Sequence, residues 1–247
     1  MKANIKKILS IFSVFLCLFV ITICSMILYI KNNNSNSYYL NMNIESTDNN
    51  DESIPIDYGK IISDVREKYN NDDVKGILEI ENTDYIVPVM QSNDNDYYLN
   101  HDAYGNDNYM GSIYLDYRVS IDSSRKLLIY GHNSSNIDMP FKILEEFYDK
   151  DYYDNHKYVD LTTEKGKKRY EIFSVYVEVE DFSYMRVNFK DDEEYLNHLL
   201  KLKSKSMYDT GVEVTKDDEV LILQTCSTHK DYRNYQRKFL LIILRRV

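Results

Sequence analysis

The sequence predicts a mainly β fold, a closed or nearly closed barrel of eight strands. One helix is expected before the barrel, another is inserted before the seventh strand, and a transmembrane helix comes first. Three observations predict this arrangement. Short aliphatic and aromatic runs recur after Gly76 with polar turns between them. Few helical patterns interrupt that series, and a long uncharged apolar run lies near the N-terminus.

The apolar run covers residues 8–30 and is rich in Ile, Leu, Phe and Val. At about 1.5 Å per helical residue, it is long enough to cross a hydrocarbon core of about 30 Å. Lys2, Lys6 and Lys7 precede it without an acid, so the positive-inside bias places residues 1–7 in the cytoplasm. A cleaved signal peptide is the alternative, but no small-x-small cleavage site follows the run.

The segment 31–57 is dominated by Asn, Ser, Asp and Glu and predicts a solvated linker that buries too little apolar surface to fold. Residues 58–247 then form the predicted folded domain. Its first element is an amphipathic helix over residues 58–69, in which Ile61, Ile62, Val65 and Tyr69 recur at helical spacing.

Eight short runs with high β propensity follow, each bounded by polar residues. The predicted strands are residues 77–80, 85–90, 112–117, 126–130, 158–161, 170–179, 220–225 and 239–244. Two helices interrupt them. Residues 140–147 begin with Pro140, which suits a first helical turn. Residues 191–204 have acids at the start and lysines at the end, which complements the helix dipole.

The chain is acidic, with a formal net charge of -10. Because the first 30 residues carry three lysines and no acid, the remainder has a charge of -13, three more negative than the whole. Such a balance argues against nucleic acid or other polyphosphate partners. Acidic clusters such as residues 191–194 lack the spacing of a calcium loop, so no metal or cofactor is expected.

One of the three cysteines stands apart. Cys17 and Cys24 fall inside the apolar run, which leaves Cys226 alone in the exterior domain. It has no partner there for an intramolecular disulfide, and an unpaired thiol in an oxidising compartment suggests either a functional or a buried structural role. Cys226 closes the apolar strand 220–225, which would fix the position of its sulfur.

An imidazole is predicted at the end of another strand. His132 follows the strand 126–130, and Gly131 between them allows a sharp turn. A thiol and an imidazole from two strand ends supply the minimum for acyl transfer, a nucleophile and an acid/base group. The second histidine near the thiol, His229, is expected to be a loop residue.

A cation to stabilise developing negative charge is also predicted. Arg237 is expected to open the last strand, where its guanidinium would bind a substrate carbonyl or the oxyanion. Arg233 competes for this role but lies in a polar loop with Asp231 and Asn234.

Around these residues the sequence resembles the class B sortases, over residues 58–247. The segment Leu223-Gln224-Thr225-Cys226 fits that family's Leu-x-Thr-Cys signature, and Tyr130-Gly131-His132-Asn133 fits its Tyr-Gly-His box. The helix 191–204 falls where class B members carry a helical insertion. Gln224 departs from the small Ser or Thr common at that position, which puts the sorting-signal preference in doubt.

The resemblance implies a sortase-like barrel and a cysteine transpeptidase of Gram-positive bacteria. In that scheme Cys226 cleaves the sorting signal of surface proteins after Thr, and the acyl group passes to an amine of peptidoglycan or its precursor. His132 is the acid/base and Arg237 the oxyanion group. Substrate-binding residues are expected at Gln224, Thr225 and Asn133.

Three alternatives stay open. A secreted cysteine peptidase would hydrolyse its acyl intermediate, although papain-like enzymes place Cys before His in the chain. A pilus-type sortase usually has a lid before the barrel and a second apolar anchor at the C-terminus. A non-catalytic surface-binding domain on a stalk would leave Cys226 without a role.

Overall fold

The computed structural model describes residues 19–26 and 55–247. Residues 19–26 are helical. The described residues include no helix that is both long and apolar enough to cross a bilayer. Most of the predicted span 8–30, and of the linker 31–57, lies outside the described residues. The chain divides into two compact units, Met1–Tyr38 and Tyr39–Val247.

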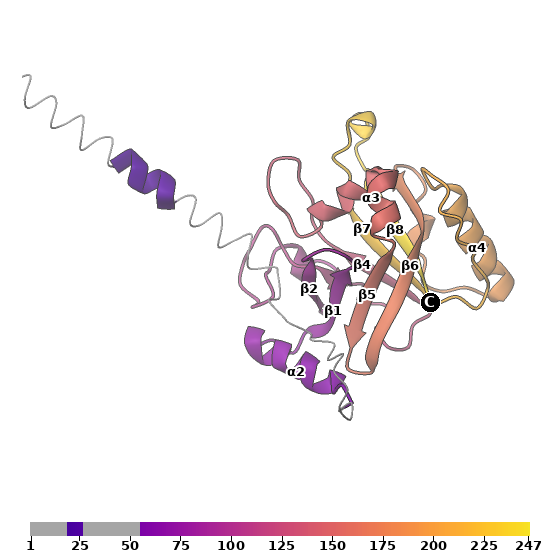
Figure 1. Ribbon diagram of the computed structural model, residues 1–247, viewed down its shortest axis with the longest axis horizontal. Helices are drawn as coiled ribbons and strands as arrows, with labels where there is room; N and C mark the ends of the chain where they lie inside the picture. The colour runs from indigo at the N-terminus through magenta and orange to yellow at the C-terminus, as the bar shows by residue number, and fades with distance from the viewer. Residues whose placement is uncertain (1–18, 27–54) are drawn as a thin grey trace, which may run out of the picture. The chain divides into compact units, whose positions relative to one another are not determined.

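The described part of the second unit is built on a closed β-barrel (Figure 1). Around the barrel the strand order is β1-β2-β3-β4-β7-β8-β6-β5, which confirms the predicted mainly β class and the eight strands. The strands are β1 Val74–Ile80, β2 Ile86–Met90, β3 Tyr114–Leu115, β4 Lys126–Tyr130, β5 Tyr158–Thr163, β6 Gly166–Glu178, β7 Val220–Cys226 and β8 Phe239–Arg246.

Strand positions agree with the prediction better than strand lengths do. The strand β4 has the expected bounds, whereas β6 begins four residues earlier than predicted and β3 has two residues where six were expected. The early start of β6 comes from its tight hairpin with β5, in which Thr163 pairs with Gly166. The strand β3 is short because the chain turns at Asp116, whose carboxylate accepts a hydrogen bond from the backbone N–H of Arg118, two residues later.

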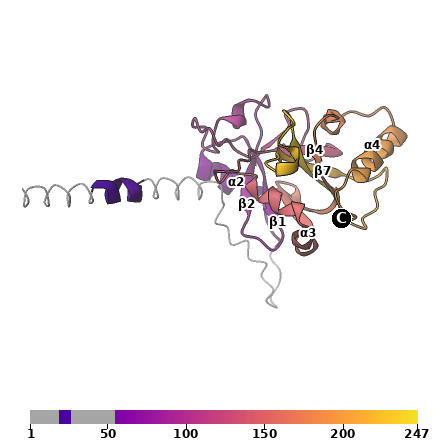
Figure 2. The same ribbon diagram turned by 90° about the horizontal axis from the view of Figure 1, so that it is seen from above.

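Two of the predicted helices are confirmed and lie on opposite sides of the barrel (Figure 2). The helix α2 (Tyr58–Tyr69) begins at Asp57, whose carboxylate accepts from the N–H of Lys60. It ends at Asn70, which adopts the left-handed conformation. The helix α4 (Asp192–Ser204) is capped in the same way by Asp191, and it precedes β7 as expected.

The third predicted helix, residues 140–147, is observed as a 3₁₀ helix, and a short α-helix that was not predicted follows it. Residues Lys142–Tyr148 form a 3₁₀ helix, η2, and Lys150–Asn155 form α3. The break falls at Asp149, which has an extended backbone and whose carboxylate caps α3 by accepting from the N–H of Asp151. This cap between Tyr148 and Lys150 explains why one continuous helix does not form.

A parallel pair of strands positions the candidate site. The strands β4 and β7 are joined by five register pairs, from Lys126 with Val220 to Tyr130 with Gln224. Both strands are almost completely buried up to their last residues. Since parallel strands end at the same edge, the segments that follow Tyr130 and Gln224 leave the sheet together.

Candidate active site

The residues after β4 continue alongside the end of β7. The backbone N–H of Gly131 donates to the carbonyl of Gln224 at 3.2 Å, one step beyond the last register pair. The hydroxyl of Thr225 donates to the carbonyl of Gly131 at 2.8 Å. The amide of Asn133 donates to the carbonyl of Cys226 at 2.9 Å. These bonds place the segment 131–133 beside the segment 224–226, which brings the backbones of His132 and Cys226 into neighbouring positions.

The thiol of Cys226 lies at the exposed end of β7. Desolvation by the surrounding protein raises the pKa of this thiol, and the positive charge of Lys238 partly opposes that shift. The protein therefore holds the group mainly as a thiol at neutral pH. A neighbouring base would be needed to generate the nucleophilic thiolate form of this group.

The ring of His132 is half-buried and has a defined hydrogen bond. Its Nε2 lies 2.9 Å from the carbonyl oxygen of Leu99. A carbonyl only accepts, so Nε2 carries a proton and Nδ1 is the basic nitrogen of the neutral ring. The segment 97–99 thus orients this imidazole, a contact that the Tyr-Gly-His motif did not predict.

Glycine is needed at position 131 for a different structural reason from the sharp turn that was predicted. It does not have the positive φ of a left-handed turn. A Cβ at this position would lie 2.6 Å from the ring of Phe141, whose own N–H donates to the carbonyl of His132. Glycine is therefore required because Phe141 packs against the backbone next to His132.

The loop after Cys226 is held by η2. The hydroxyl groups of Tyr148 and Ser227 share a hydrogen bond of 2.7 Å. The carboxylate of Glu145 accepts from both the N–H and the hydroxyl of Thr228, at 2.8 and 2.6 Å. Sequence analysis missed Glu145, because an acid on a short helix carries no signal that it faces a loop 83 residues away.

The two candidate arginines both lie in the exposed loop before β8. Arg237 was expected to open the last strand, but β8 begins two residues later, at Phe239, the register partner of Cys226. The guanidinium of Arg237 lies 6.0 Å from the ring centre of Phe182. Arg233 ends the short 3₁₀ helix η4 (Lys230–Tyr232). The cation that acts on the thiol is Lys238, which sequence analysis also missed.

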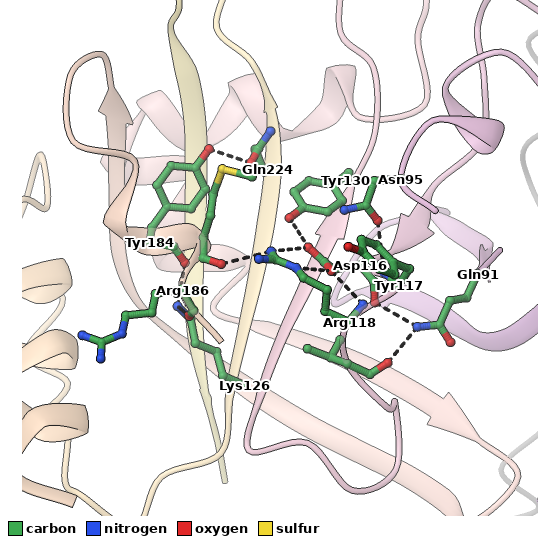
Figure 3. A network of polar contacts seen from close by, with 12 residues as sticks. Gln91, Asn95, Asp116, Tyr117, Arg118, Lys126, Tyr130, Tyr184, Arg186 and Gln224 are labelled. Atoms are coloured by element: carbon green, nitrogen blue, oxygen red, sulfur yellow. Dashed lines mark hydrogen bonds and ion pairs between the residues drawn. The ribbon is translucent and has the colours of Figure 1, made fainter. Parts of the chain in front are cut away.

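The three predicted substrate-binding residues have different environments. Thr225 is buried, and its hydroxyl is used in the bond to Gly131. Asn133 is half-buried, and its side-chain oxygen is buried without a hydrogen-bond partner among residues 19–26 and 55–247. The side chain of Gln224 is half-buried and accepts a hydrogen bond of 2.7 Å from the hydroxyl of Tyr184, a residue that sequence analysis did not single out (Figure 3).

His229 has the environment of a loop residue. Its ring packs against the rings of Tyr148 and Tyr232, and its Nδ1 accepts from the N–H of Asp231 at 3.3 Å. These contacts stabilise the turn of η4. A polar pocket of about 510 Å³ between Arg66, Gln91 and Asp122 lies elsewhere, and none of the predicted site residues lines it.

Comparison with known proteins decides the family. Residues 78–242 match the model described as the sortase domain. The chain belongs to the sortase family. This segment spans β1 to β8 and contains both strand ends that carry Cys226 and His132. The resemblance to class B sortases that the two motifs predicted is confirmed, together with the expected enzyme class.

Sortase B proteins are the relatives that this sortase domain resembles. Sortase B of Listeria monocytogenes is 37% identical over 165 residues, which cover 66% of the chain and 66% of that protein, just under two thirds. The crystal structure of Clostridium perfringens sortase B matches with a TM-score of 0.67 at 28% identity, over 75% of the chain and 99% of that structure. A Staphylococcus aureus sortase B–substrate complex matches with a TM-score of 0.65 at 25% identity, over 76% and 92%.

Proposed function

We propose that this chain is a cysteine transpeptidase of the class B sortase type. It cleaves the sorting signal of surface proteins after Thr and transfers the acyl group to an amine of peptidoglycan or its precursor. The observation that supports it most is the pairing of β4 and β7, continued by the bonds of Gly131, Thr225 and Asn133. It supports the proposal because the backbones of Cys226 and His132 lie on adjoining segments at the ends of the two strands.

In the proposed reaction His132 takes the proton of the Cys226 thiol, and the sulfur attacks the carbonyl carbon of the Thr residue. The tetrahedral intermediate collapses with cleavage of the C–N bond, and His132 returns the proton to the leaving amine. The acceptor amine then attacks the thioacyl group. Its proton passes to His132, the C–S bond breaks, and His132 returns the proton to the departing thiolate, which restores the resting enzyme.

A side chain is the better candidate for oxyanion stabilisation than the next backbone amide. The N–H of Ser227 already donates to the carbonyl of Lys238 at 2.9 Å, and the N–H of Thr228 donates to Glu145. Neither is free to bind a developing negative charge. We assign this role to Arg237, with Arg233 as the alternative, because a guanidinium on an exposed loop can reach the charge as it forms.

The substrate contacts are assigned to the residues that flank the nucleophile. Gln224 precedes Cys226 by two residues and shares its strand face. The side-chain oxygen of Asn133 would accept a hydrogen bond if the loop adjusts, and its amide supports the Cys226 backbone. Thr225 contributes through its backbone, since its hydroxyl is occupied.

The proposed location is the outer face of the cell membrane of a Gram-positive bacterium. Residues 8–30 would be a single-pass anchor with residues 1–7 in the cytoplasm, and residues 31–57 would be the linker to the catalytic domain, 58–247. The partners would be surface proteins that carry sorting signals, the peptidoglycan acceptor and the membrane itself.

A peptide-cleavage panel with and without an added amine tests the function. A transpeptidase forms an amine-linked product and cleaves faster when the amine is present, because the amine resolves the thioacyl intermediate. Cleavage that ignores the amine and yields only the free acid identifies a hydrolase instead. No cleavage of any Thr-containing peptide contradicts both assignments.

A further inference from the structure

Only the oxygen of the Gln224 side-chain amide is hydrogen-bonded within the described part of the chain. Its oxygen accepts the hydrogen bond of Tyr184, while its nitrogen has no hydrogen-bond partner in the described part of the chain. This nitrogen is not one of the fully buried polar atoms without a partner, which means that it is accessible to solvent. Because side chains two apart on a strand share a face, this free N–H₂ group lies on the same side of β7 as the thiol of Cys226.

The hydroxyl that holds Gln224 is itself fixed in place. Tyr184 is completely buried in the 3₁₀ helix η3 (Phe182–Met185). The buried Nζ of Lys126 donates to the carbonyls of Tyr184 and Arg186 at 2.6 and 2.7 Å. A guanidinium N–H of Arg118 donates to the carbonyl of Met185 at 3.1 Å. Two cations of the barrel thus hold three consecutive carbonyls (Figure 3).

The hydrogen-bond network that begins at Gln224 on β7 returns to Tyr130, the residue paired with Gln224 on β4. Arg118 forms a two-pronged ion pair with the buried carboxylate of Asp116, at 2.9 and 2.7 Å. That carboxylate also accepts from the hydroxyl of Tyr130 at 2.7 Å, and Tyr130 is the register partner of Gln224. The network is therefore closed. It runs from Gln224 through Tyr184, Met185, Arg118 and Asp116 to Tyr130, which pairs with Gln224.

A group held in this way is pre-organised, so little side-chain entropy is lost when it binds. A solvated glutamine at a strand end would not need a completely buried phenol to orient it. The oriented atom is a donor, which means that it recognises an oxygen and disfavours a cation.

We propose that Gln224 selects the sorting signal through a hydrogen bond from its amide N–H to a side-chain oxygen of the peptide, and that Tyr184 is the positioning residue that orients this amide. The inference rests on the proposed function and specifies its substrate class. The preferred signals carry Gln, Asn, Glu or Asp at the position beside Gln224, and Lys is rejected there.

The test is peptide binding to the Cys226→Ala protein, which cannot react. The probes are fluorescent nonapeptides with one fixed Thr. Each has Gln, Glu or Lys at one preceding position, and the other positions are randomised. At one position the Cys226→Ala protein is expected to prefer Gln and Glu over Lys by about 10- to 100-fold, the range of one hydrogen bond to a buried or charged group.

Two changes at Gln224 test the donor. Adding Gln224→Glu converts the donor into an anionic acceptor and should invert the preference toward Lys at that same position. Adding Gln224→Met keeps the size but removes the donor, so the preference should fall to nearly one. Gln236→Glu is the matched control, because it adds the same charge to the exposed loop before β8 and should leave the preference unchanged.

Removing the Tyr184 hydroxyl tests the positioning role. Tyr184→Phe should reduce the preference several-fold, whereas Tyr232→Phe, at a phenol without a hydrogen bond to β7, should not. In the reactive protein Tyr184→Phe should raise KM for the preferred peptide and leave kcat unchanged. A purely structural role would change stability and leave the preference as it was.

The proposal is overturned if no position shows the preference, if the Gln224 variants keep it, or if Tyr184→Phe matches its parent. These results are separate from the fate of the proposed function. Thioacyl formation by the reactive protein is measured independently, so a transpeptidase without this selectivity and a selective binder without transpeptidation are both recognised.

Discussion

At the scale of single residues, the thiol of Cys226 is shifted away from reactivity. Burial raises its pKa, and the nearby Lys238 lowers it only in part. The thiol thus needs a base, and in the proposed mechanism proton transfer to His132 accompanies attack. The proposed mechanism is therefore general-base catalysis and not a preformed ion pair.

This arrangement predicts how alkylation of Cys226 depends on pH. Because only the thiolate reacts, the rate of modification by iodoacetamide should rise about tenfold per pH unit and keep rising beyond pH 9, above the ordinary thiol range. Lys238→Met removes the cation that lowers the pKa, so it should slow the reaction at a fixed pH. Mass spectrometry of the peptide that contains Cys226 measures the rate.

The exposed Lys165 provides the control, since Lys165→Met removes a charge from the hairpin between β5 and β6 and should have no effect. A rate that reaches its plateau below pH 8 would show that the thiol is activated and would contradict the general-base account.

A second prediction at this scale separates the two arginines. Arg237→Lys keeps the charge but loses the forked donor, and it should reduce the rate of acyl transfer by roughly 10²-fold or more if the guanidinium binds the oxyanion. Single-turnover kinetics with a cleaved peptide provides the measurement. If Arg233→Lys causes the loss and Arg237→Lys does not, the assignment is reversed.

Sequence patterns located the two central residues because each follows an apolar strand with a distinct motif. The residues that support Cys226 through hydrogen bonds are not marked by any such sequence motif. Tyr184 bonds Gln224 and Glu145 bonds Thr228 across 40 and 83 positions of sequence, and those contacts depend on how η3 and η2 fold over the barrel. Lys126 offered one clue, since it shares a strand face with the buried Leu128 and Tyr130.

At the scale of elements, the segment Tyr184–Arg186 depends on the buried Lys126. The Nζ of Lys126 also lies 2.9 Å from Nε2 of His198 on α4. Burial and the charges of Arg118 and Arg186 lower the pKa of Lys126 to about 7. Burial and the charge of Lys126 lower the pKa of His198 to about 3, so His198 stays neutral and acts as an acceptor for the charged lysine.

This lysine gives the fold a specific pH dependence. Its pKa is lower in the folded state than in the unfolded state, so the unfolded chain binds more protons between about pH 7 and 10. The free energy of unfolding should therefore rise with pH in that range, by up to about 1.4 kcal/mol per unit. Urea denaturation at pH 7, 8 and 9 measures it.

Lys126→Met should remove this rise, although it also destabilises the protein at every pH because the carbonyls of Tyr184 and Arg186 lose their donor. The comparison stops at pH 9 because tyrosines with raised pKa values, such as Tyr130 and Tyr170, destabilise the fold at higher pH. The raised pKa of Cys226 contributes equally to the pH dependence of unfolding in the wild-type protein and in Lys126→Met. An unchanged slope in Lys126→Met would contradict the role assigned to this lysine.

Elements with a clear period were predicted well, and those fixed by tertiary contacts were not. The helices α2 and α4 have apolar stripes and acidic caps, and β4 and β7 are continuous apolar runs. The helix α3 has no apolar stripe beyond the buried Tyr153, and β3 is a two-residue strand that ends before Asp116. Sequence period alone does not determine such elements.

At the scale of the whole molecule, the closed barrel supports the site by fixing β7 between two neighbours. The strand pairs with β4 on one side and with β8 on the other through seven register pairs, from Val220 to Cys226. The proposed nucleophile, Cys226, therefore lies on a rigid element, while the cations that would assist it lie on the following loop. This division suits an enzyme that must admit a peptide and then an amine at one thiol.

The proposed anchor predicts where the whole chain is found. The full-length protein should sediment with membranes and resist a high-salt wash, because an apolar helix is held by the hydrocarbon core and not by charge. A chain without residues 1–30 should remain in the supernatant. Sedimentation of the shortened chain, or release of the full chain by salt, would contradict the anchor.

The most direct measurement of the central claim is the intact mass of the protein after reaction with a Thr-containing sorting-signal peptide. The wild-type protein should gain the mass of the acyl fragment, on Cys226, and lose it when an amine is added. Cys226→Ala should remain folded and gain nothing, and His132→Ala should form the adduct far more slowly. An adduct or cleavage that persists in Cys226→Ala would contradict the account.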